Sequence, residues 1–489
     1  MLLPTPTPTP TSAALLPPDH PDRAALAAEV HARPPEPLTA PSRASYVAVR
    51  IEGEARAAEL AHIASLCARF GVPPPSGGRT QWAADLGPLR FKWERHGEFS
   101  SYTVFSPGPA LLVAPLIAPL AEPFSGPSVD PFAAPAAALL PAGWLAAVPG
   151  LTVFAAHAEL ASAPHQAPAG AAGPLALPTA EQLAARFGAN VVVGVGIGDG
   201  AGLAFTDFMI HGDGFARYLL LDRDMTARQA GRMLQRLFEI EAYRMMALLA
   251  LPVARGLWAR LPVIEHTLVE LTGRMAHSQP NARASQAGPA HPAVGADDEL
   301  LAQLMALAAE VESALAASQA RFSASRAYHA LVSTRIGELR EQRIPGLQTI
   351  DEFMARRLSP AMATCATVSQ RLHNLSERVA QASSLLSTRV DIARQQQNQT
   401  LLAATARRAK LQLRLQQTVE GLSVAAIVYY LTGLVGYGVK ALKAAGLPLS
   451  PDLVTGAAVP LLAVGAWWVL RRVHQRIAHD EAQGDNGSF

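Results

Sequence analysis

The sequence is poor in charged side chains and in cysteine. Asp, Glu, Lys and Arg make up 16% of the 489 residues, against about 25% in an ordinary soluble protein. The two cysteines, Cys67 and Cys365, lie far apart in the chain, which excludes a disulfide framework and a metal site built on several thiolates. Basic and acidic residues nearly balance, 41 against 39, so no overall positive field predicts nucleic-acid binding. With apolar residues at 50%, these deficits favour a membrane-associated protein.

Common catalytic motifs and a secretory signal are also missing. The chain has no Gly-x-Ser-x-Gly elbow, no P-loop and no His-Glu-x-x-His, so hydrolase and NTPase chemistry has no support. Residues 1–22 include an alternation of Pro and Thr at 4–11, and they have no Lys or Arg and no uninterrupted apolar run. This pattern predicts an extended, disordered tail and not a signal peptide.

Two C-terminal segments, 421–439 and 453–470, contain no charged side chain. A transmembrane helix needs about 20 mostly apolar residues, and Trp467 and Trp468 stand near an end of the second segment, as aromatic residues do at membrane interfaces. We expect two transmembrane helices joined by a short external loop, 440–452. The alternative is a buried hairpin in a soluble core.

Basic residues around these segments predict their orientation. The flanks outnumber the loop in positive charge, so both termini, including the tail 471–489, are expected in the cytoplasm. The basic residues before the first span are Arg407, Arg408, Lys410 and Arg414. Because they adjoin the bilayer, they are also candidates for contact with anionic lipid headgroups.

The region 23–275 has the pattern of an α+β domain with antiparallel strands. Alternating residues predict a strand at 44–51, a hairpin over 89–105, and further strands at 151–160 and 215–221. Helical spacing predicts a helix within 52–70 and another after the cap residue Thr226. The glycines of 196–200 loosely match a dinucleotide fingerprint, but a strand pattern follows them where that fingerprint needs a helix. We therefore predict two strands within 190–210 joined by a Gly-Asp-Gly turn.

Residues 276–296 are predicted to be a linker, and 297–420 a helical stalk. A heptad seam, typical of coiled coils, begins near Ser359 and comprises Ala361, Cys365, Val368, Leu372, Leu375, Val379, Ala382 and Leu386. A single helix over 359–420 is roughly 90 Å long at ~1.5 Å per residue. Such a helix must pack on partners, which are either other helices of the same chain or further copies of it.

Two polar segments are the candidate cleft of the cytoplasmic region. One holds His20, Arg23, Glu29, His31 and Arg33, and the other holds Glu94 and His96. An enzyme site at these residues requires that the two segments meet within hydrogen-bond or one-water reach, roughly 10 Å. The alternative is a surface segment with local hydrogen bonds. No pair has the His-x-x-x-His spacing of a helical metal site.

The chain from His20 to about His479 resembles a bacterial family, the domain of unknown function 3422. The resemblance rests on 20–23 (HPDR), 29–34 (EVHARP), 91–99 (FKWERHGEF) and 416–423 (QQTVEGLS). It implies a membrane-anchored bacterial protein and brings no established activity.

A weaker resemblance, over about Ser359–Leu442, is to CorA-type cation channels, which also place two C-terminal spans after a long stalk helix. Their first span ends in a Tyr/Phe-Gly-Met-Asn signature. Here Tyr437 and Gly438 match, whereas Val439 and Lys440 replace Met and Asn. A ring of Lys440 side chains would repel a divalent cation. If the protein conducts, this resemblance implies that Thr432, Gly436 and Tyr437 face the pore.

The leading interpretation is an oligomeric, membrane-anchored scaffold or channel-like protein of CorA layout. We expect no enzyme activity, cofactor or metal, and we expect the lipid bilayer and further copies of the chain as partners. The alternatives are an enzyme in the cytoplasmic domain and a protein that binds anionic lipids.

Overall fold

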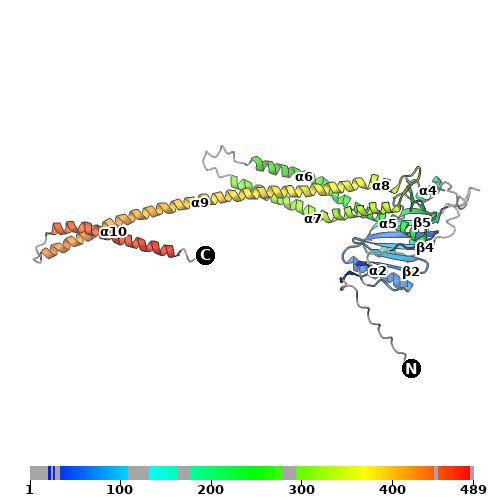
Figure 1. The fold of residues 1–489 in the computed structure, drawn as a ribbon, viewed down its shortest axis with the longest axis horizontal. Helices are drawn as coiled ribbons and strands as arrows, with labels where there is room; N and C mark the ends of the chain where they lie inside the picture. Colours follow the sequence, from blue (N-terminus) through cyan, green and yellow to red (C-terminus); the bar gives the residue numbers. More distant parts are fainter. Residues whose placement is uncertain are drawn as a thin grey trace, which may run out of the picture. The chain divides into compact units, whose positions relative to one another are not determined.

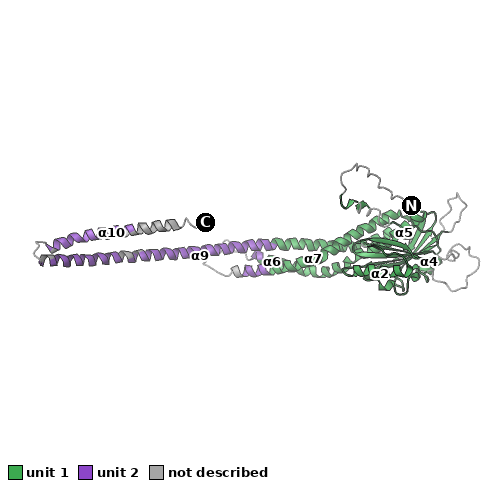
Figure 2. Cartoon of the chain, turned by 90° about the horizontal axis from the view of Figure 1, so that it is seen from below, with its two compact units in different colours: residues 1–274, 303–381 green, residues 275–302, 382–489 purple. Residues whose placement is uncertain are grey.

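A computed structural model describes residues 20–23, 26–27, 34–76, 78–107, 132–163, 177–277, 293–444 and 450–484. The chain divides into two compact units (Figure 2). Unit 1 comprises residues 1–274 and 303–381, and unit 2 comprises residues 275–302 and 382–489. Most of the predicted tail and linker lies outside the described residues.

Unit 1 is built on a nine-stranded mixed sheet of order β2-β3-β4-β1-β5-β8-β7-β6-β9. The strands are β1 (Ser42–Arg50), β2 (Gln81–Asp85), β3 (Arg90–Arg95), β4 (Phe99–Pro107), β5 (Leu151–Ser162), β6 (Val193–Ile197), β7 (Gly202–Thr206), β8 (Ala216–Asp222) and β9 (Gln342–Arg343). The expectation of antiparallel strands is wrong at one pair, because β5 and β8 run parallel. A parallel pair needs a long crossover, and here α4 (Ala180–Phe187), β6 and β7 lie within it.

Both predicted hairpins are confirmed. β3 and β4 pair antiparallel on either side of His96–Gly97, and β6 and β7 pair antiparallel around Gly198–Gly200. Gly198, Asp199 and Gly200 have φ of 59°, 60° and 85°, a conformation that glycine adopts without steric cost. The glycines therefore form a hairpin turn, and the helix that a dinucleotide site needs does not follow them.

Helices cover both faces of the sheet (Figure 1). On one face, α2 (Ala55–Phe70) packs Ile63, Leu66 and Cys67 against Phe91 and Trp93 of β3. On the other face lies α5 (Ala227–Leu248), whose Phe238 ring stacks on Tyr46 of β1 at 4.9 Å and meets Tyr218 of β8 edge-on at 5.9 Å. The alternation of core-facing side chains in the strands accounts for these two apolar layers.

The chain also forms the long helices α6 (Ala250–His277), α7 (Ala293–Leu339) and α9 (Ser359–Ala444), and the short helix α8 (Ile350–Arg357) between the last two. Within unit 1, α6 is linked to α7 by Arg260–Glu310 at 2.7 Å and to α9 by Arg371–Glu265 at 2.9 Å. Thr349 and Glu352 have the three-residue spacing of a capping box, and they form that box at the start of α8.

The predicted seam of α9 is buried inside the single chain, with one correction. Met362, and not Ala361, occupies the first buried position, since Met362 is 8% exposed and Ala361 is only partly buried. The other buried members are Cys365, Val368, Leu372, Leu375, Val379, Ala382 and Leu386. Helices of the same chain therefore cover this part of α9, and it needs no second copy there.

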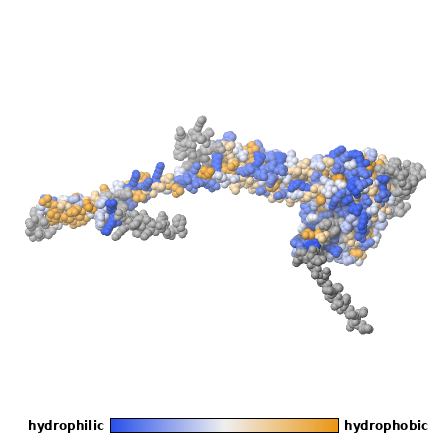
Figure 3. All heavy atoms as spheres, in the orientation of Figure 1, coloured by the Kyte–Doolittle hydropathy of each residue, from blue (hydrophilic) through white to orange (hydrophobic). Residues whose placement is uncertain are grey.

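Unit 2 contains the rest of α9 and α10 (Pro451–Gly484). In α9 beyond Val390, most side chains are exposed, and Val439 is a buried exception. The two helices meet where Gly436 approaches Thr455, since a methyl group on Gly436 would lie 3.6 Å from Thr455 Oγ1. Figure 3 shows hydrophobic side chains over the end of this helical hairpin.

Candidate functional site

Strand β3 carries a polar face that α5 covers. Phe91 and Trp93 point into the apolar core, so the alternate residues Lys92 and Glu94 face the other side. Both are buried, and Lys92 Nζ lies 3.0 Å from Glu94 Oε1. Lys92 Nζ also donates to the carbonyl of Pro34 at 2.8 Å. Pairing and hydrogen bonding offset the large cost of burying these two charges.

The segment 34–38 is held tightly against this face. Glu36 forms an ion pair with Arg90, and Leu38 N donates to Ala227 O at 2.9 Å. Gly231 of α5 allows this close approach, because a methyl group there would lie 1.8 Å from the backbone oxygen of Glu36. The segment that directly follows the first predicted polar segment is thus fixed between β3 and α5.

A small pocket lies between this segment, the sheet and α5. Its volume is about 20 Å³, which is room for one or two water molecules and far below the 300–1,000 Å³ of a typical ligand pocket. Its polar lining residues are Glu36, Tyr46, Lys92, Glu94, His96, Ser101, Thr103, Gln235 and Glu239. The pocket can hold water among paired charges, but it has no space for a substrate.

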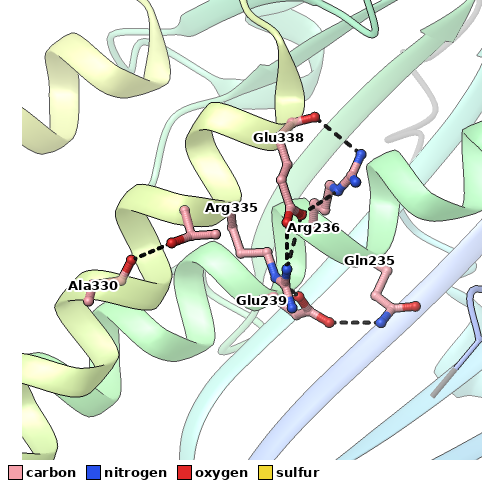
Figure 4. Close-up of polar contacts among 7 residues, drawn as sticks. Gln235, Arg236, Glu239, Ala330, Arg335 and Glu338 are labelled. Carbon is pink, nitrogen blue, oxygen red and sulfur yellow. Dashed lines mark hydrogen bonds and ion pairs between the residues drawn. The ribbon is translucent and has the colours of Figure 1, made fainter. Parts of the chain in front are cut away.

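An ion-pair network joins this pocket to α7 (Figure 4). Glu239 accepts from Gln235 Nε2 at 2.7 Å and is also paired with Arg335 of α7. Arg335 Nη1 contacts Glu338 at 3.0 Å, and Glu338 in turn accepts from Arg236 Nε at 2.9 Å. Burial alone lowers the pKa of Arg335, yet the neighbouring carboxylates of Glu239 and Glu338 outweigh it and raise that pKa above its usual value. The network fixes α7 to α5 with every charge compensated.

The predicted polar cleft is brought together only in part. Glu94 and His96 line the pocket, whereas His20 lies on an exposed turn, where its Nδ1 accepts from the amide of Asp22 at 3.2 Å. Arg23 is also exposed, and Glu29, His31 and Arg33 lie outside the described residues. In the described part of the chain, no three His, Cys, Asp or Glu side chains gather in a way that could hold a metal ion.

Sequence reasoning missed other residues that line the pocket with Glu94 and His96. Lys92 was recognisable, because it alternates with core aromatics and so had to face another layer. Gln235 and Glu239 stand four residues apart on a helix face that also carries the buried Leu234 and Phe238. Polar residues within an apolar helical face signal a buried polar network.

The residues predicted for a pore or for lipid contact lie on unit 2. Thr432 donates its hydroxyl to Val428 O at 2.7 Å, and Gly436 faces Thr455 of α10. Tyr437 is exposed, the space beside Gly438 is open, and Lys440 Nζ lies 5.9 Å from the centre of the Tyr437 ring. The exposed basic residues before the apolar segment are Arg407, Arg408, Lys410 and Arg414.

Aromatic and basic residues also meet at the far end of the second apolar segment. The guanidinium of Arg471 lies 5.0 Å from the centre of the Trp467 ring, and that of Arg472 lies 4.5 Å from the centre of the Trp468 ring. Such cation–π contacts fix a charge beside an amphipathic ring.

Comparison with known proteins identifies the family but brings no activity with it. No curated protein and no solved structure matches the chain. The model of the family described as protein of unknown function (DUF3422) matches residues 18–477, which is nearly the whole sequence. The chain therefore belongs to the DUF3422 family.

Proposed function

We propose that this chain is an integral protein of the bacterial inner membrane that crosses the bilayer twice. Residues 421–439 of α9 and 453–470 of α10 are the spans, and the mixed α/β domain is held in the cytoplasm as part of an oligomeric scaffold. One observation carries the proposal. The apolar windows within 422–441 and 452–469 are only 6% and 0% buried by the rest of the chain.

In the described part of the chain, four helical stretches are long and apolar enough to cross a membrane, and the two outside the proposed spans are better packed. The windows within 227–277 and 296–339 are 33% and 22% buried. Their apolar faces meet the sheet and one another in unit 1, where Ala254, Leu261 and Leu268 of α6 are all 1% exposed or less. This difference supports two spans rather than four.

The free energy of transferring the exposed apolar side chains out of water supports lipid as their surroundings. Leaving one Leu, Ile or Val side chain in water costs about 1.5–3 kcal/mol relative to burying it. Large exposed members of the two segments include Leu422, Ile427, Leu434, Leu453, Leu461 and Val464. A water-exposed hairpin would forfeit this stabilisation at each of these positions, whereas the hydrocarbon of a bilayer supplies it.

Polar groups in and beside the segments suit a bilayer as well. The hydroxyls of Ser423 and Thr432 donate to carbonyls one turn earlier, at 3.0 and 2.7 Å, so they do not enter hydrocarbon unpaired. Trp467 and Trp468, each with an arginine over its ring, match the aromatic and basic residues that anchor spans at the interface.

The geometry favours a scaffold over a cation channel of CorA layout. Gly436 faces α10 and Thr432 is bonded to its own helix, so two of the three residues expected in a pore contact protein instead. Lys440 adds positive charge at the mouth, which opposes divalent cations. Ion flux into liposomes that contain the protein tests this choice, and a cation flux above that of empty liposomes would reverse it.

Fractionation and labelling test the membrane placement. The chain is expected to stay in the pellet after alkaline carbonate washing, since spans are removed only by detergent. A cysteine at Ser450 should react with an impermeant maleimide in intact spheroplasts, whereas one at Ala404 should react only after lysis. The native cysteines are both buried. A carbonate-soluble protein, or labelling at Ala404 first, overturns the proposal.

A second candidate function is binding of anionic lipid headgroups by the exposed cluster Arg407, Arg408, Lys410 and Arg414. Each basic residue near an anionic surface contributes about 1 kcal/mol. Native mass spectrometry of the detergent-solubilised protein with added phosphatidylglycerol measures the lipids retained. Replacing all four residues by Glu should lower that number, whereas Arg378→Glu, an exposed charge elsewhere on α9, should not. Equal retention in both variants discards this candidate.

A further inference from the structure

One face of α9 carries an uncharged stripe that nothing in the described chain covers. The stripe comprises Leu411, Leu415, Val419, Leu422, Ala426, Tyr430, Gly433, Tyr437 and Ala441. Its six largest side chains, those of Leu, Val and Tyr, are 59% to 77% exposed. The spacing is 4-4-3 repeated, an 11-residue period close to that of a straight helix. One face of the helix therefore stays uncharged over about eight turns.

The stripe lies on the opposite side of α9 from α10. Among the residues of 411–441 whose burial is described, the half-buried or buried ones are Val424, Val428, Thr432, Val435, Gly436 and Val439, and Gly436 is the one that approaches Thr455. At 100° per residue, the middle of that packed face is about 150° from the middle of the stripe. One face of α9 thus packs on α10, whereas the face that carries the stripe contacts no other described helix.

We propose that a second copy of this chain packs in parallel along this stripe. The inference rests on the proposed function, because two chains inserted with the same orientation bring identical residues to the same height in the bilayer. Symmetric contacts then place like against like, and the stripe suits this because it carries no charge to repel its copy.

Lipid alone does not account for the stripe. Leu411, Leu415 and Val419 precede the proposed span and lie among Arg408, Lys410 and Arg414, on the aqueous side. Leucines at this level need a protein surface. The same face then continues into the span without interruption, so one partner helix covers both parts.

The tyrosines favour a copy of the chain over an unrelated helix. The hydroxyls of Tyr430 and Tyr437 make no hydrogen bond to any described residue, and Tyr430 is at the middle of the span. A polar group in hydrocarbon is costly without a partner. A phenol both donates and accepts a hydrogen bond, so the same tyrosine on a second copy completes the bond. Gly433, which has open space beside it, leaves room between the two rings for close helix packing.

Cysteine cross-linking of the full chain in native membranes tests the face directly. Leu415→Cys is on the stripe, and Leu413→Cys is its control, since Leu413 is similarly exposed at 58% but points away from the stripe. A disulfide needs Cα atoms within about 7 Å. With a mild oxidant, Leu415→Cys should give a band of twice the chain mass, at least fivefold more than Leu413→Cys.

A second pair of variants probes the packing inside the membrane. Gly433→Leu fills the space reserved for the partner, whereas Gly438→Leu changes a glycine that is equally open but off the stripe. The Leu415→Cys cross-link should fall severalfold with Gly433→Leu and stay unchanged with Gly438→Leu. Because neither glycine has an atom within 4 Å of an added methyl group, both single chains should fold.

The outcomes separate this inference from the proposed function. A protein that carbonate washing releases would defeat the membrane placement itself. A protein that stays in the membrane but cross-links equally at both positions, or only to a chain of another mass, overturns the stripe as a self-contact. Absence of any cross-link, together with a monomer in nanodiscs, overturns it too.

Discussion

The buried carboxylate of Glu59 offers a sharp test of how the α/β domain is held together. Its side chain is fully buried on α2. Oε1 accepts from Trp93 Nε1 at 2.7 Å and from the Tyr102 hydroxyl at 2.9 Å, while Oε2 accepts from Arg95 Nη2 at 2.8 Å. One acid thus joins α2 to both β3 and β4. Burial first, and the negative charge of Glu59 second, raise the pKa of Tyr102 far above its usual value, so its phenol stays a donor.

Removing this carboxylate by Glu59→Ala should lower the free energy of unfolding by about 2–7 kcal/mol. The Trp93 and Tyr102 donors each lose their acceptor inside the core, at roughly 1–3 kcal/mol apiece. Arg95 is 21% exposed, so water replaces part of its ion pair and adds at most about 1 kcal/mol. Urea unfolding of the detergent-solubilised chain, followed by tryptophan fluorescence, measures the change.

Two comparisons make the Glu59 prediction refutable. Glu54→Ala removes an exposed carboxylate next to the same helix that makes no capping hydrogen bond, and it should shift stability by less than about 0.5 kcal/mol. Tyr102→Phe should cost less in the Glu59→Ala background than in the native chain, since the two side chains share one bond. A loss below about 1 kcal/mol for Glu59→Ala would show that the three hydrogen bonds do not hold α2 on the sheet.

Three further predictions follow from local geometry. Gly231→Ala should displace the segment 34–38 from α5, because the new methyl group meets the backbone of Glu36, and faster amide exchange or proteolysis at 34–38 measures this. Burial raises the pKa of Glu341 to about 7 in the folded chain, above its ordinary value of 4.5. The protonated Glu341 side chain therefore contributes its full stabilisation below about pH 4.5, and this contribution is lost as the pH rises through 7. Glu341→Gln should therefore flatten urea midpoints between pH 5 and 8, and an unchanged slope contradicts it. Leu372→Ala, in the buried seam, should cost about 2–5 kcal/mol, whereas Leu385→Ala, 69% exposed, should change little.

Local patterns predicted the elements of this protein well and their assembly less well. The β3–β4 hairpin follows from alternation around His96–Gly97, and α8 follows from the Thr349–Glu352 box. The parallel β5–β8 pair was not predictable in the same way, because the residues that separate the two strands include a hairpin that pairs on the outer side of β8. Strand order depends on contacts between distant segments, and the two-residue β9, which completes the sheet at β6, has no periodicity to detect.

The polar site illustrates a different limit. Glu94, His96, His20 and Arg23 were all singled out as polar residues in an otherwise apolar region. In the structure Glu94 and His96 line the buried pocket, whereas His20 and Arg23 are exposed. The exposed turn at His20 has no pattern that distinguishes it from a buried polar segment. Glu239 was hidden because it looks like an ordinary surface charge until the layer above it is known.

The seam and the stripe of α9 show that the spacing of apolar residues identifies a packing partner only when their burial is also known. Up to Leu386 the apolar residues of α9 follow a heptad repeat, which is compatible with packing either within one chain or between copies. The structure shows that helices of the same chain cover them. From Leu411 the period lengthens to eleven and the side chains are exposed. A change of period means a change of the surface that the helix packs on. The stretch 411–441 therefore needs a different partner from the stretch 359–386. Its uncharged face, which carries Tyr430 and Tyr437, is suited to the same face of a second copy of the chain.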